Sequence, residues 1–173
     1  MSHVLRQALW IPLLFLGLGL EVHASEKFTS EEGRFTVRMP LGKVEATKES
    51  AAAGASPVDT YVFTSANAGN TTAFMVSYSD LPGAIQNPKA SAELLATAVQ
   101  ATVGEQGKLL FEKTVRFKKM TGKELRCQKE SFDLYSRIFL VGGRMYQLVV
   151  LGKQGTLKLS EVQWFFASFD VNN

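Results

Sequence analysis

Apolar and polar side chains alternate along much of this chain, and this period of two is typical of β-strands. The clearest case is residues 34–39, where Phe35, Val37 and Met39 would share one face of a strand. β-Branched and aromatic residues indicate further strands between loops rich in small and polar residues. These strands are expected at residues 44–49, 59–65, 72–79, 108–117, 124–132, 135–141 and 144–151. Loops are expected at residues 51–57 and 66–70, and tight turns at residues 120–122 and at Gly142-Gly143.

Two segments instead have the apolar period of a helix. The first, residues 88–103, opens on Pro88 and is followed by Gly104, which suit the start and the end of a helix. The second is expected at residues 156–167. Their apolar faces would consist of Leu95, Val99, Thr102 and Val103 in the first helix, and of Leu159, Val162 and Phe166 in the second. Hairpins of strands without β-α-β alternation predict one α+β domain, with a central antiparallel β-sheet flanked by helices.

Residues 1–24 have the pattern of an export signal. Arg6 precedes an apolar run at residues 8–20, and small residues around Ala24 fit cleavage before Ser25. This run is shorter than the roughly 20 apolar residues that a transmembrane helix needs. The sequence therefore predicts a signal peptide (1–24) and an exported domain (25–173), either periplasmic or secreted, with an uncleaved anchor as the alternative.

Only two histidines occur, His3 and His23, and both lie in the expected signal peptide. A mature chain without histidine excludes Ser-His-Asp and Cys-His catalysis. With one cysteine, Cys127, it also excludes ordinary tetrahedral zinc sites, and no metal or other cofactor is expected. Cys127 itself fits either a small buried apolar residue or a thiol that forms an intermolecular disulfide.

Positive charge gathers in residues 108–129, where eight lysines and arginines accompany only Glu112 and Glu124. Such a hairpin would attract an acidic protein face or an anionic envelope surface. The alternative is a solvated edge whose lysines prevent strand pairing with other chains. Nucleic acid is not expected, because aromatic residues are not interleaved with these cations. The predicted partner-binding residues are Lys113, Arg116, Lys118, Lys119 and Lys123.

Three bulky aromatic residues, Trp164, Phe165 and Phe166, follow one another in the second expected helix. Consecutive residues cannot share one helix face. Either Trp164 or Phe165 therefore lies at the rim of a ligand groove or an interface, or all three pack in the core with Trp164 covering the sheet edge.

Several short motifs, in this order, resemble small exported bacterial domains of the PsbP-like superfamily, which includes PsbP, Mog and DcrB-like proteins. These motifs are GRFTVRMP (33–40), YSDLP (78–82), GKEL (122–125), RMYQL (144–148) and SF (168–169). The resemblance implies an antiparallel sheet between helices, and a binding or assembly role without catalysis. It does not carry over a photosynthetic role.

These observations favour an exported, non-catalytic binding or accessory module that acts through protein–protein interaction in the cell envelope. A small-molecule or lipid carrier is the alternative, and it would need an apolar groove of about 300 Å³ or more between the sheet and the last helix. A hydrolase would need two carboxylates within about 10 Å of each other. The candidate carboxylates are Asp59, Asp80, Glu124, Glu130 and Asp133.

Overall fold

The computed structural model describes residues 25–172, except 41–42, 54–55, 68–70, 82–87 and 119. The expected signal peptide and Lys119 lie outside the described residues. Within the described part of the chain, no helix has both the length and the apolar character needed to cross a membrane.

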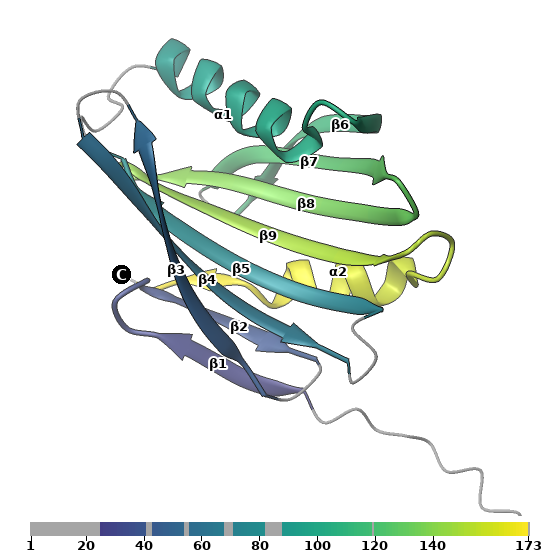
Figure 1. Ribbon diagram of the computed structural model, residues 1–173. Coiled ribbons are helices and arrows are strands. Elements are labelled where there is room, and N and C mark those ends of the chain that lie inside the picture. The colour runs from purple at the N-terminus through teal and green to yellow at the C-terminus, as the bar shows by residue number, and fades with distance from the viewer. Residues whose placement is uncertain are drawn as a thin grey trace, which may run out of the picture.

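In the described part of the chain, ten strands form two antiparallel sheets, and two helices pack on the larger one (Figure 1). The large sheet has the strand order β3-β4-β5-β9-β8-β7-β6, and the small sheet has the order β1-β2-β10. The elements are β1 (Glu26–Ser30), β2 (Phe35–Met39), β3 (Glu45–Ala53), β4 (Ser56–Ala66), β5 (Thr72–Asp80), α1 (Pro88–Val103), β6 (Gly107–Phe117), β7 (Met120–Lys129), β8 (Phe132–Val141), β9 (Arg144–Lys153), α2 (Leu159–Ser168) and β10 (Asp170–Val171). The predicted α+β class is confirmed.

Two hydrophobic cores lie on opposite faces of the large sheet. Leu95, Val99 and Val103 of α1 pack on one face, against Leu125 and Ile138. The other face is covered by α2 and by the small sheet, as Figure 1 shows. This second core contains Phe35, Val37 and Met39 from β2, together with Val162, Phe165 and Phe166 from α2. A central sheet between helices is the arrangement that the sequence predicted.

The start of α2 differs from the prediction. Residues 154–156 form a turn, and the helix begins at Leu159, whose side chain is 58% exposed. The prediction that Leu159 faces the sheet was wrong. Leu157, just before the helix, packs against the core instead, and its side chain occupies the space beside Gly152.

Parts of one expected loop and of one expected turn also belong to strands. Of the loop expected at residues 51–57, residues 51–53 and 56–57 pair in register as the ends of β3 and β4, with Ala51 opposite Val58, and residues 54–55 lie outside the described residues. Alanine and serine have low β-propensity, so the sequence pattern did not reveal this pairing. The turn expected at residues 120–122 was wrong, because Gly122 lies inside β7, opposite Phe139. The chain turns earlier, where Lys118 has a positive φ of 54°.

Arg144 on β9 joins the two sheets. Its Nε and Nη2 donate to the two carboxylate oxygens of Asp80 on β5, each at 2.6 Å. Its Nη1 donates to the carbonyl oxygen of Glu32, between β1 and β2, also at 2.6 Å. The guanidinium group also lies 4.6 Å from the ring centre of Tyr78. One side chain therefore fixes the β1–β2 turn onto the large sheet.

Replacing Arg144 with lysine is expected to lower the free energy of unfolding by about 1.5 kcal/mol. Lysine keeps the charge but cannot make the two-pronged contact with Asp80 and also reach Glu32. Urea denaturation would measure the loss, with Arg38→Lys as the control because Arg38 is an exposed arginine on β2. Equal stability of the two variants would contradict the bridging role.

Candidate partner-binding edge of the large sheet

β6 is one of the two edge strands of the large sheet, and it belongs to the half of the sheet that α1 contacts. It pairs with β7, and no other strand of the described residues pairs with its second edge. The strand is 11 residues long, and most of its side chains are exposed. A long edge strand presents unpaired N–H and C=O groups on which another chain can add a strand.

Three consecutive apolar residues lie exposed on this edge strand. Leu109, Leu110 and Phe111 are 38%, 39% and 37% exposed, and they are three of the five large apolar side chains that are exposed among the described residues. The pairing with β7 shifts register between Leu109 and Phe111, so Leu110 is an additional residue at a β-bulge. An exposed apolar cluster on an open sheet edge is typical of a protein-contact surface.

The predicted basic residues are largely engaged in ion pairs. Lys113 Nζ lies 2.9 Å from Glu124 Oε1, Lys118 Nζ 2.6 Å from Asp170 Oδ1, and Lys123 Nζ 2.7 Å from Glu112 Oε1. Arg116 is exposed and makes no ion pair with any described residue. Four of the five predicted cations lie among the described residues, and of these four Arg116 is therefore the most available to a partner.

The strand register places these cations on both faces of the sheet. Lys113 lies opposite Glu124, on the face that α2 covers, whereas Arg116 lies opposite Thr121, on the face of α1. Lys123, opposite Thr114, shares the face of Arg116. The structure therefore distributes these cations over both faces of the edge and does not gather them into one patch.

Glu124 is a buried structural anion, with only 2% of its side chain exposed. Arg137 Nε donates to Glu124 Oε2 at 2.5 Å, and Lys113 Nζ approaches the other oxygen. Burial alone would raise the pKa of this carboxyl, but the hydrogen bonds from Lys113 and Arg137 outweigh it and lower the pKa below its ordinary value. Glu124 is therefore a charged, salt-bridged sheet residue.

Three other candidate carboxylates are held by cations as well. The pairs are Asp59 with Lys48, Asp80 with Arg144, and Asp133 with Arg126. The hydrogen bond from Lys48 lowers the pKa of Asp59, and that from Arg144 lowers the pKa of Asp80. Residues with these pKa directions stay ionised at neutral pH, so none of them suits the role of a general acid.

Metal sites and reactive thiols place specific requirements on the residues that form them. Within them, no cluster of three or more histidine, cysteine, aspartate or glutamate side chains could hold a metal ion. Cys127 is a buried free cysteine, and burial raises the pKa of its thiol. This supports the interpretation of Cys127 as a small core residue.

Comparison with known proteins concerns the fold. No protein-family model matches the sequence, and no curated protein shows significant similarity to it. Among solved structures, the chain is similar to cyanobacterial PsbP (CyanoP) from Synechocystis sp. PCC 6803, with a TM-score of 0.56 over 88% of this chain and 95% of that one, at 14% identity. The fold is PsbP-like. A second similar structure is protein PA94 from Pseudomonas aeruginosa, described as a putative regulator of unknown function, with a TM-score of 0.38 over 83% of this chain and 92% of that one, at 14% identity.

The PsbP-like fold suggested by the motifs at residues 33–40 and 144–148 is confirmed. Within this fold, sequence reasoning missed the apolar residues of the β6 edge. The signal was nevertheless present: three consecutive bulky apolar residues, Leu109 to Phe111, break the alternation of a strand and cannot all face one core.

Proposed function

We propose that this chain is an exported, non-catalytic accessory domain that binds an acidic, extended segment of another envelope protein along β6. The observation that carries the proposal is the exposed run Leu109-Leu110-Phe111 on an open edge with cations on both faces. The partner segment would pair with the β6 backbone and cover these side chains. Arg116 would attract its acidic residues and add to the rate of encounter.

The apolar run sets the strength of this contact. Covering each of the three partly exposed side chains would contribute about 1 kcal/mol from burial of apolar area. Backbone pairing and charge attraction would add to this gain, and the ordering of the bound segment would oppose it. A transient complex is therefore expected, as suits an accessory protein.

Two features support a role without catalysis. From residue 25 onward the chain has no histidine. Four of the five candidate carboxylates, all except Glu130, are held by lysine or arginine. The export part of the proposal rests on the signal-like pattern of residues 1–24.

Site-specific photocrosslinking in the intact native envelope would test this surface. A photoreactive benzoylphenylalanine at Leu110, on the β6 edge, is expected to give one discrete protein adduct. The same group at Leu159 is the matched control, because Leu159 is also an exposed apolar residue but lies on α2, away from β6. Arg116→Glu should reduce the Leu110 adduct several-fold, and added salt should reduce it as well.

Two results would contradict the proposal. One is the same adduct pattern from Leu110 and Leu159, which would indicate nonspecific contact. The other is the absence of any adduct from Leu110 in an envelope where the protein is folded.

A further inference from the structure

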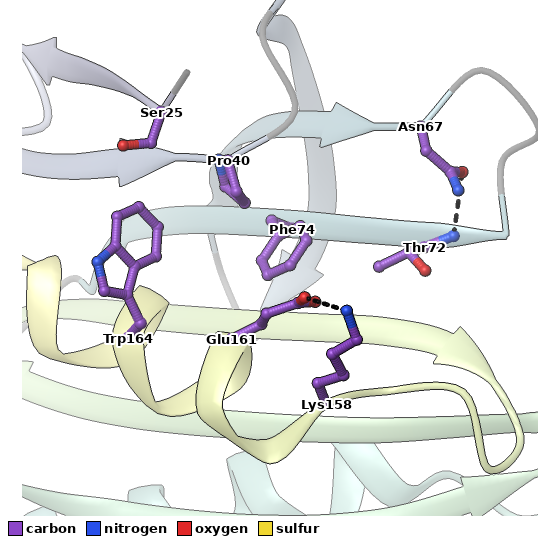
Figure 2. A pocket seen from close by; sticks show the side chains of 8 residues that line it. All are labelled: Ser25, Pro40, Asn67, Thr72, Phe74, Lys158, Glu161 and Trp164. Carbon is purple, nitrogen blue, oxygen red and sulfur yellow. Dashed lines mark hydrogen bonds and ion pairs between the residues drawn. The ribbon is translucent and has the colours of Figure 1, made fainter. Parts of the chain in front are cut away.

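A cavity of about 500 Å³ opens between α2 and β5, on the face of the large sheet opposite α1 (Figure 2). Its volume lies in the range of small-molecule sites. The lining side chains come from α2 and the residue before it, from β5 and the β4–β5 turn, and from the ends of the β1–β2 hairpin. They are Ser25, Pro40, Asn67, Thr72, Phe74, Lys158, Glu161 and Trp164.

Trp164 supplies a flat apolar wall. Its neighbours Phe165 and Phe166 are buried, whereas Trp164 is 41% exposed. Figure 2 shows its indole ring beside the cavity, facing the region of Phe74 and Pro40. Of the two sequence interpretations, the structure therefore favours Trp164 at the rim of a ligand groove. A ligand that covers this ring would gain both apolar burial and ring contact.

Most of the other lining residues are polar, and their charges balance. Five of the eight lining residues are polar or charged. Lys158 Nζ lies 3.3 Å from Glu161 Oε1, so the two charges at the rim compensate each other. An acyl chain would remove these polar groups from water without replacing their hydrogen bonds, which is costly. A charged ligand would compete with the Lys158–Glu161 pair. The apolar groove expected for a lipid carrier is present only in part, because polar side chains line this cavity beside Pro40, Phe74 and Trp164.

Asn67 is held in place at one side of the cavity. Its Oδ1 accepts hydrogen bonds from the backbone N–H groups of Thr71 at 2.8 Å and Thr72 at 3.2 Å. Its amide nitrogen donates to Thr71 Oγ1 at 2.7 Å, and it carries a second hydrogen. A fixed amide with a remaining donor is a preorganised group for a hydroxyl ligand.

We propose that this cavity binds a neutral saccharide. A sugar ring presents a face of C–H bonds, which fits the indole ring of Trp164, and a rim of hydroxyl groups, which fits Thr72, Asn67 and Glu161. This ligand class meets the three features of the cavity together: an aromatic wall, a polar rim and no net charge. The site lies on α2 and β5, apart from the β6 edge, and the proposal is independent of protein binding there.

Trp164 provides its own probe. The chain has two tryptophans, Trp10 and Trp164, so the full chain carrying Trp10→Phe has a single indole. We would record its indole N–H signal by NMR while adding maltotriose, cellotriose or triacetylchitotriose. At least one neutral trisaccharide is expected to shift the signal saturably, with a Kd of about 1 mM or lower. Decanoate and trigalacturonate serve as the apolar and the anionic comparison ligands.

Thr72→Val tests the placement of the site, because it replaces a hydroxyl with a methyl group of similar shape in the same strand. Binding should weaken about fivefold, the loss of one hydrogen bond. Leu159→Ala, an exposed change on α2 outside the cavity lining, should leave the affinity unchanged. The dispersion of the backbone amide signals checks that each variant is folded.

Three results would overturn the proposal. The first is no saturable shift with any of the three neutral saccharides. The second is tighter binding of decanoate or trigalacturonate, which would assign another ligand class. The third is an unchanged affinity in folded Thr72→Val, which would place the saccharide elsewhere.

Discussion

Glu124→Gln is expected to lower the free energy of unfolding by about 3 kcal/mol, as is usual when one member of a buried ion pair is lost. The carboxylate is 2% exposed and is shared by Lys113 and Arg137. Glutamine keeps the shape but removes the negative charge. Arg137, only 15% exposed, would then lack its charge partner and keep the hydrogen bond to Gln163 and the ring of Phe166.

Lys113→Met is the matched control for this variant. The lysine side chain is 58% exposed, so its removal should cost less than about 1 kcal/mol. Urea denaturation of the two variants and the wild type would measure the difference. If Glu124→Gln were no less stable than Lys113→Met, the carboxylate would not anchor this part of the sheet.

The loss caused by Glu124→Gln should also depend on pH. The fold lowers the pKa of Glu124 below its ordinary value of 4.5. The stabilisation is therefore fully present above that ordinary value and is lost as the pH falls through the lower, folded-state pKa. The stability gap between the wild type and Glu124→Gln should be constant near neutral pH and should close below pH 4.5.

Gly122→Ala is expected to destabilise the fold by about 3 kcal/mol through overpacking. A methyl group at this position would overlap the carbonyl oxygen of Ile138 and would lie 2.6 Å from the ring of Phe139. The first obstacle belongs to the backbone of β8, so side-chain rotation cannot relieve it. β7 and β8 would have to separate where they are paired.

Gly142→Ala is the control for Gly122→Ala. Gly142 has a φ of 57° in the β8–β9 turn, and a methyl group there would meet nothing within 4 Å. Only the backbone strain of about 1 kcal/mol should remain. Thermal and urea unfolding should therefore rank Gly122→Ala well below Gly142→Ala. The reverse order would show that β7 and β8 tolerate a side chain between them.

The parts of the fold that local chemistry determines could be predicted from the sequence. The bounds of α1 matched because Pro88 and Gly104 mark its ends, and β2 matched because Phe35, Val37 and Met39 alternate with polar residues. The turn after β6 was misplaced because Gly122 resembles a turn residue. Its actual role is a close approach between two strands, which depends on the register of β7 with β8.

The candidate sites depend on neighbours that are distant in the sequence. The pairing of Lys113 with Glu124 arises from the register of β6 with β7, and that of Lys118 with Asp170 joins segments far apart in the chain. Counting charges along the sequence could therefore locate the basic hairpin, but it could not show which of its cations form ion pairs in the fold and which remain available to a partner. Trp164 was recognised as a candidate rim residue, whereas Asn67 and Thr72 come from other elements and share no sequence signal with it.

The pairing of β2 with β10 has a consequence for the order of folding. The Arg38 backbone and the Ser168 side chain, which share a hydrogen bond at this junction, lie 130 residues apart. The hairpin of β1 and β2 precedes the large sheet in the chain, whereas its third strand, β10, follows both the large sheet and α2. The small sheet can therefore close only after all the elements between β2 and β10 have been made, and a pairing over so large a sequence separation is expected to form slowly.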